Sequence, residues 1–106
     1  MLRFLTTLTL TFLATPGLAD TDLPDQATGA VYVLGTATAD EVALTNKIDG
    51  EMDAYVLTKD CYATHPIYGL GAWQAVEGGW RIMVGGTQIV SFEGATPFDN
   101  PACVPQ

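Results

Sequence analysis

Hydrophobic and polar residues alternate most regularly in the last third of the chain. Trp80, Ile82 and Val84 recur at every second position and therefore share one face of an extended segment. The segment that follows shows the same pattern, and paired glycines at 78–79 and 85–86 bound the first of the two. Alternation that is interrupted at short intervals by glycine turns is typical of antiparallel strands. We predict a β-meander whose strands cover 71–76, 80–84 and 87–93.

Shorter runs with the same strand chemistry occupy the first half of the chain. Val42 and Leu44 share one face of their run, as Tyr55 and Leu57 do in the next run. An Asp-Gly pair at 49–50 lies between the two runs and is a strong signal for a hairpin turn. We predict strands over 30–34, 41–45 and 53–59.

The remaining segments lack strand chemistry. Residues 20–29 are polar, and we predict an extended leader rather than a regular element. Residues 60–68 contain a cysteine, a histidine and a proline, and we predict a loop or a single helical turn there. The ending, 97–106, has three prolines, which exclude it from the middle of a sheet. About six short strands in one small chain favour a closed or nearly closed barrel, because closure removes exposed strand edges.

The start of the chain has the order of features of a secretory signal peptide. Arg3 gives a positive start, an uncharged apolar and threonine run extends from Phe4 to Leu13, and Gly17 and Ala19 place small residues before the cleavage bond. The apolar run is too short for a membrane-spanning helix, and no cysteine follows the cleavage bond to carry a lipid. We predict a periplasmic or secreted protein without a membrane anchor. Its parts are a signal peptide at 1–19, an extended leader at 20–29 and a β-barrel domain at 30–106.

Charge narrows the range of partners. Removal of residues 1–19 takes away Arg3 and no acidic residue, so the formal net charge changes from −8 to −9. Such a chain repels phosphate backbones and anionic membrane surfaces. We therefore expect neither nucleic acid nor a membrane as a partner.

The two cysteines, Cys61 and Cys103, are expected to form a disulfide because an even number of cysteines in an exported chain indicates pairing. A small domain buries too little surface to be comfortably stable without such a link. In the chain-entropy description the link stabilises the fold by roughly 4 kcal/mol. The expected fold class is all-β: a small antiparallel up-and-down β-barrel, or a barrel-like meander, with one disulfide.

The usual sets of catalytic residues cannot be assembled from this sequence. His65 is the single histidine and is expected at the surface of its loop, and Ser91 is the single serine and lacks a nucleophile elbow. Asp49, Glu51 and Asp53 could offer oxygen atoms to calcium, but the calcium-binding loop of helix–loop–helix proteins is absent. We expect these carboxylates on a solvated turn. The expectation is a protein that is not an enzyme and has no cofactor and no metal site.

Two tryptophans, Trp73 and Trp80, flank a predicted hairpin. Tryptophan buries a large area, which favours positions in the barrel core. The alternative is that they line a ligand site at the barrel mouth, although so short a chain leaves little interior volume for a ligand.

The order of elements invites comparison with known exported barrels. It consists of a leader, an aromatic strand, a cysteine, a tryptophan, a Gly turn, a strand, a second Gly turn and an aromatic strand. Its members are Leu23-Pro24, Ala27, Gly29, Tyr32-Val33-Leu34, Cys61, Trp73, Gly79-Trp80-Arg81-Ile82, Gly86 and Val90-Ser91-Phe92. In this order the chain resembles the alkaline-proteinase (serralysin) inhibitor family of small exported β-barrels with a disulfide and an N-terminal trunk. It departs from that family at Asp40-Glu41, where the family has its first cysteine, and in the Pro-rich tail that carries Cys103.

The resemblance implies a function and a site. In the family, the trunk enters the cleft of a secreted zinc metalloprotease and the free N-terminal amine approaches the metal. Carried over to this chain, Asp20 supplies the amine, and Thr21, Asp22 and Leu23 line the primed subsites of the protease. We therefore expect a monomeric periplasmic inhibitor of a secreted zinc metalloprotease. The alternative is a non-enzymatic envelope binding module that holds a protein or small-molecule ligand on the same barrel.

Overall fold

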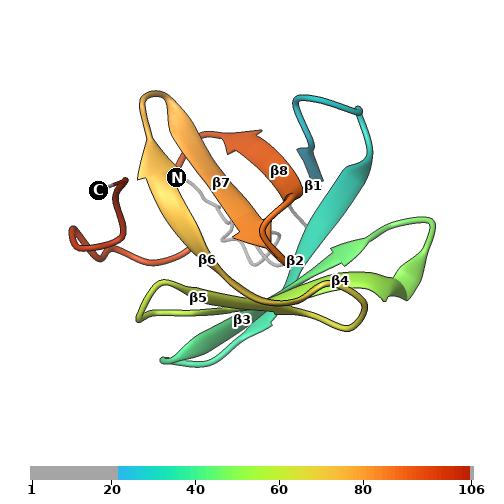
Figure 1. Cartoon of the computed structure of the whole chain (residues 1–106), viewed down its shortest axis with the longest axis horizontal. Coiled ribbons are helices and arrows are strands. Elements are labelled where there is room, and N and C mark those ends of the chain that lie inside the picture. The colour runs from blue at the N-terminus through green and yellow to red at the C-terminus, as the bar shows by residue number, and fades with distance from the viewer. Residues whose placement is uncertain (1–21, 106) are drawn as a thin grey trace, which may run out of the picture.

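The strands form one antiparallel sheet that is nearly closed into a barrel. The computed structural model describes residues 22–105. In this part of the chain eight strands follow one another in sequence order, each hydrogen-bonded to the next (Figure 1). They are β1 (Asp22–Pro24), β2 (Val31–Ala37), β3 (Glu41–Asn46), β4 (Gly50–Thr58), β5 (Tyr62–His65), β6 (Gly69–Val76), β7 (Gly79–Val84) and β8 (Gln88–Glu93). The expected all-β, up-and-down architecture is confirmed, and the six expected strands are present with shifted ends.

Two strands lie where the sequence predicted none. β1 falls within the expected leader, and its Leu23 pairs with Tyr32 of β2. β5 falls within the expected loop at 60–68, with its residues alternately exposed and buried. The buried members of β5 are Ala63 and His65, one small and one polar, so they give no hydrophobic pattern. The sheet therefore begins at Asp22 rather than at residue 30.

Asp25 connects the first and last parts of the sheet. The amide of Gln26 donates to the carbonyl oxygen of Ser91 at 2.9 Å, and the amide of Ser91 donates to Asp25 Oδ1 at 3.0 Å. The hydroxyl of Thr28 donates to the other oxygen of the same carboxylate at 2.7 Å. Asp25 is buried, so these bonds are shielded from water. They close the sheet between the β1–β2 turn and β8, where a row of open backbone groups would otherwise remain.

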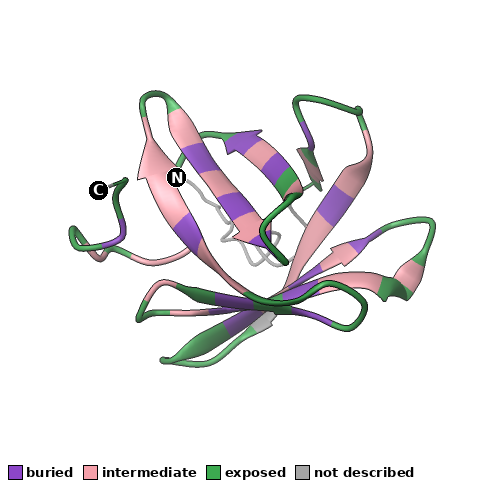
Figure 2. Cartoon of the chain, viewed as in Figure 1, coloured by how far each residue is buried: buried purple, intermediate pink, exposed green. Residues whose placement is uncertain are grey.

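The core fills the barrel interior with the inward-facing residues of successive strands. Figure 2 shows buried bands alternating with more exposed ones along β7 and β8, as a strand with one buried face requires. The tight curvature needs glycine at Gly71, where a Cβ atom would overlap the carbonyl oxygen of Met83. The buried hydrophobic residues are Tyr32, Val42, Leu44, Tyr55, Leu57, Ala63, Trp73, Trp80, Ile82, Val84, Val90, Phe92 and Cys103.

The turns between strands gather at two opposite ends of the barrel, because sequential antiparallel strands reverse direction each time (Figure 1). We call the first the mouth end; it holds the connections 25–30, 47–49, 66–68 and 85–87. The second is the disulfide end; it holds the connections 38–40, 59–61 and 77–78 and the tail after β8. β1 runs toward the mouth end, because the connection 25–30 follows it there.

Candidate functional site

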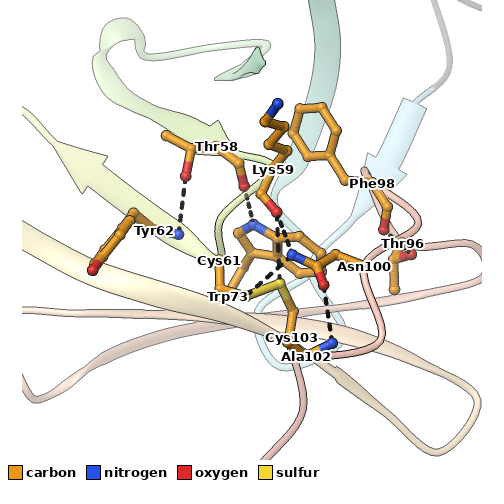
Figure 3. Close-up of a disulfide and its surroundings, with 10 residues drawn as sticks. All are labelled: Thr58, Lys59, Cys61, Tyr62, Trp73, Thr96, Phe98, Asn100, Ala102 and Cys103. Atoms are coloured by element: carbon orange, nitrogen blue, oxygen red, sulfur yellow. Dashed lines mark hydrogen bonds between the residues drawn. A yellow bond between two sulfur atoms is a disulfide. The ribbon is translucent and has the colours of Figure 1, made fainter. Parts of the chain in front are cut away.

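The disulfide end is fixed by the C-terminal tail. Cys61 and Cys103 are bonded to each other, as the cysteine count predicted. The amide of Ala75 donates to the carbonyl oxygen of Cys103 at 2.7 Å, and the side chain of Asn100 donates to the carbonyl oxygen of Lys59 at 2.7 Å. Figure 3 shows these tail residues gathered around the disulfide. The link is structural, since it binds an irregular segment to the β4–β5 turn and to β6.

Trp73 and Trp80 belong to the core. Trp73 is completely buried, and its indole nitrogen donates to the carbonyl oxygen of Thr58 at 2.7 Å (Figure 3). Trp80 is 1% exposed and packs on Phe92, with ring centroids 4.8 Å apart. Both tryptophans therefore lie in the barrel core, the position that their size favoured.

A polar cluster centred on Asp53 lies at the mouth end. The hydroxyl of Tyr32 donates to Asp53 Oδ2 at 2.5 Å, and the side-chain amide of Asn46 donates to the same oxygen at 3.0 Å. The other oxygen, Oδ1, lies 2.9 Å from His65 Nε2. Residues from β2, β3, β4 and β5 thus meet at one carboxylate.

His65 is part of the barrel wall and not a surface residue, which corrects the expectation from the sequence. It is 4% exposed because β5 turns its side chain inward next to Tyr55, with ring centroids 4.8 Å apart. Its Nδ1 accepts the amide hydrogen of Ile67 at 3.1 Å, so in the neutral ring the hydrogen is on Nε2 and is donated to Asp53. Both nitrogens are therefore occupied, which leaves the ring no free position for a substrate proton.

The electrostatics of the cluster favour an ionised Asp53 and a neutral Tyr32. Burial alone would raise the pKa of Asp53, but the hydrogen bonds from Tyr32, His65 and Asn46 together hold it below its usual value. Burial, followed by the hydrogen bond to the negative Asp53, raises the pKa of Tyr32 above its ordinary value. The cluster thus holds a charged carboxylate, bonded to three side chains, at the mouth end of the barrel.

The three carboxylates that the sequence placed on a solvated turn separate in the structure. Asp49 and Glu51 are exposed, whereas Asp53 is half-buried in the polar cluster. Within residues 22–105, no three His, Cys, Asp or Glu side chains lie together as metal ligands would. Asp53 therefore differs from its neighbours in environment, which corrects its expected place on a solvated turn.

A hollow of about 430 Å³ opens at the mouth end beside the polar cluster. Its walls combine carboxylate, amide and imidazole groups with large apolar side chains. The lining residues are Asp49, Met52, Asp53, His65, Ile67, Tyr68 and Gln88. Sequence reasoning missed this site because the residues come from three separate turns and their flanking strands.

The N-terminal site expected from the family resemblance is placed only in part. Asp20 and Thr21 lie outside the described residues, as does the predicted signal peptide at 1–19. Asp22 accepts a hydrogen bond from Lys47 Nζ at 3.1 Å, and Leu23 packs against the core. Asp22 and Leu23 are therefore wall residues of the barrel. A second hollow of about 490 Å³ adjoins them and is lined by Asp22, Leu23, Pro24, Gln26, Phe92 and Glu93.

Comparison of the chain with protein-family models, curated protein sequences and solved structures gives no match. Among residues 22–105, no helix has the length and apolar character needed to cross a membrane.

Proposed function

We propose that this protein is an exported, non-catalytic inhibitor of a secreted zinc metalloprotease, and that it acts through the N-terminus left by signal cleavage. The observation that supports this proposal best is the anchoring of β1. Its Asp22 is paired with Val33 and bonded to Lys47, and the following Asp25 is tied to Ser91. The segment before Asp22 is thereby attached to a fixed point on the barrel.

This anchoring narrows the inhibitory segment to Asp20 and Thr21. Two extended residues span at most about 7 Å. Asp22 is bonded to Lys47 and Leu23 packs against the core, so in this proposal they position the segment instead. The barrel surface beside β1, including the hollow near Glu93, must then approach the rim of the protease cleft.

The chemistry of a free N-terminus suits this role. An α-amine has an ordinary pKa of about 8, so a zinc ion readily displaces its proton and the neutral nitrogen binds the metal. Attachment to a rigid strand lowers the ordering cost that a flexible segment incurs on binding. A very short segment on a fixed anchor therefore gives a defined position for the amine.

The proposal is tested by an inhibition assay with purified protein that begins at Asp20. Increasing amounts are added to a serralysin-type zinc protease, and cleavage of a fluorogenic peptide is followed. Inhibition at submicromolar concentration is expected, together with competition by the peptide substrate. Full protease activity at about 100 μM inhibitor, with the N-terminus verified as Asp20, contradicts the proposal, since binding that weak is worth less than about 6 kcal/mol.

A further inference from the structure

Large apolar side chains gather at the mouth end. Met52, Ile67 and Tyr68 line the hollow and are 66%, 62% and 44% exposed. Ile48, which precedes the lining residue Asp49, is 92% exposed. We call these four residues, together with the hollow, the mouth surface. Exposed apolar groups concentrated around one hollow are typical of an interaction site.

Within the described part of the chain, a buried hydroxyl without a hydrogen-bond partner belongs to Tyr55, which packs against the wall of the hollow. Tyr55 is completely buried, and its Oη makes no hydrogen bond to residues 22–105. Its ring packs on His65. Burial raises the pKa of Tyr55, and the polar side-chain groups of Gln88 and Tyr32 lie near enough to oppose that rise. His65 and Gln88 both line the hollow, so Tyr55 lies next to two side chains of its wall. An unsatisfied buried hydroxyl is unfavourable, and a ligand that hydrogen-bonds to it or to Gln88 would remove that cost.

The charge of the hollow is negative. Asp49 and Asp53 contribute carboxylates to its walls, and Glu51 lies exposed between them in the sequence. Lys47, the basic residue of the same turn, is bonded to Asp22 and directed away toward β1. The exposed ring of Tyr68 adds an aromatic surface that attracts cations.

We propose that the mouth surface binds a lysine or arginine side chain of a partner protein, with apolar neighbours of that side chain covering Ile48, Met52, Ile67 and Tyr68. The carboxylates pair with the positive group, while the apolar rim excludes water from the pair, as in the centre of a protein interface. A small ligand would leave most of this rim in water, whereas a protein surface covers it.

The proposal is tested by NMR titration of the ¹⁵N-labelled protein, residues 20–106, with capped tripeptides. The probes are acetyl-Leu-Lys-Leu-amide, acetyl-Leu-Arg-Leu-amide and the Gln and Glu analogues. Saturable shifts at residues 49–53, 65–68 and 88 are expected with the basic peptides at millimolar concentration, with at least about tenfold weaker binding of the Gln and Glu peptides. Equal binding of all four peptides, shifts mapping elsewhere, or no saturable shift with either basic peptide would overturn the proposal.

Variants separate this site from the inhibitor function. Tyr68→Ser should weaken binding of the Lys peptide at least about threefold, whereas Tyr62→Ser, at an exposed tyrosine near the disulfide end, should leave it unchanged. Tyr55→Phe should weaken peptide binding while leaving the protein as stable as the parent or more stable, because the unpartnered hydroxyl is removed. All three variants should inhibit the protease like the parent. Unchanged peptide binding by both Tyr68→Ser and Tyr55→Phe would overturn the site.

Discussion

The hydroxyl of Tyr32 donates a hydrogen bond of 2.5 Å to the carboxylate of Asp53, 21 residues further along the chain. This bond links β2 to β4 at the mouth end, and His65 extends the link to β5. Because the carboxylate stays charged while half-buried, the cluster ties the stability of the barrel to pH.

Substitution Asp53→Asn is expected to lower the free energy of unfolding at pH 7 by about 2 kcal/mol, since bonds to a charged acceptor are lost. The pKa of Asp53 is depressed in the folded protein and is near 3.9 when unfolded, so its contribution is fully present above about pH 4. The contribution is lost as the pH falls through the folded value. Urea unfolding at several values between pH 7 and pH 2 should therefore show that the free energies of unfolding of parent and variant converge on acidification.

Asp49→Asn, at an exposed carboxylate, serves as the control, and its free energy of unfolding should depend on pH as that of the parent does. If the difference in free energy of unfolding between Asp53→Asn and the parent stayed constant from pH 7 to pH 2, the charged carboxylate would not be the source of this stability.

The disulfide should be the largest single contribution to the stability of the tail. Cys61 and Cys103 are 42 residues apart, and the double substitution to serine is expected to cost about 4 kcal/mol in the chain-entropy description. Urea unfolding of parent and variant measures this cost. Limited proteolysis should cleave the variant first within residues 94–105, which have no strand pairing. First cleavage within β2–β4 would instead show that the disulfide stabilises the barrel rather than the tail.

Two exposed ion pairs allow a matched test of whether the bond from Lys47 to Asp22 of β1 supports inhibition. Lys47 pairs with Asp22 at 3.1 Å, and Lys59 pairs with Asp40 at 2.9 Å, with both lysines about equally exposed. Each pair contributes at most about 1 kcal/mol to stability, so both alanine variants should stay folded. Lys47→Ala is expected to raise the inhibition constant up to about fivefold by loosening Asp22, whereas Lys59→Ala should leave it unchanged. If both substitutions changed the inhibition constant equally, the cause would be the loss of a positive charge and not the loss of the bond between Lys47 and Asp22.

The strands that could be predicted from the sequence are those whose inward positions hold large hydrophobic residues. β7 was predictable because large hydrophobic residues occupy every second position, at Trp80, Ile82 and Val84, and all three are buried. β1 has only three residues, with Leu23 as its single inward residue. β5 turns Ala63 and His65 inward, so its alternation is invisible to a hydrophobicity pattern.

The polar cluster and the mouth surface could not be derived from local spacing. Asp53, Tyr32 and His65 belong to three different strands, and only the register of the sheet brings them together. One signal was present: His65 stands two positions after Ala63, so recognition of β5 would have placed the histidine inward. The disulfide and the core position of the tryptophans were predictable because they follow from residue type rather than from register.

The role of the N-terminal amine is tested most directly by adding one alanine before Asp20 and measuring the inhibition constant against the zinc protease. The added residue moves the amine by about 3.5 Å while leaving the barrel and the rest of the surface unchanged. Circular dichroism and thermal unfolding of both proteins verify that the fold is the same. The proposed mechanism predicts at least about a hundredfold loss of inhibition, equivalent to about 2.7 kcal/mol, because the metal bond is lost. Equal inhibition by the extended protein and by the protein that begins at Asp20 would contradict it.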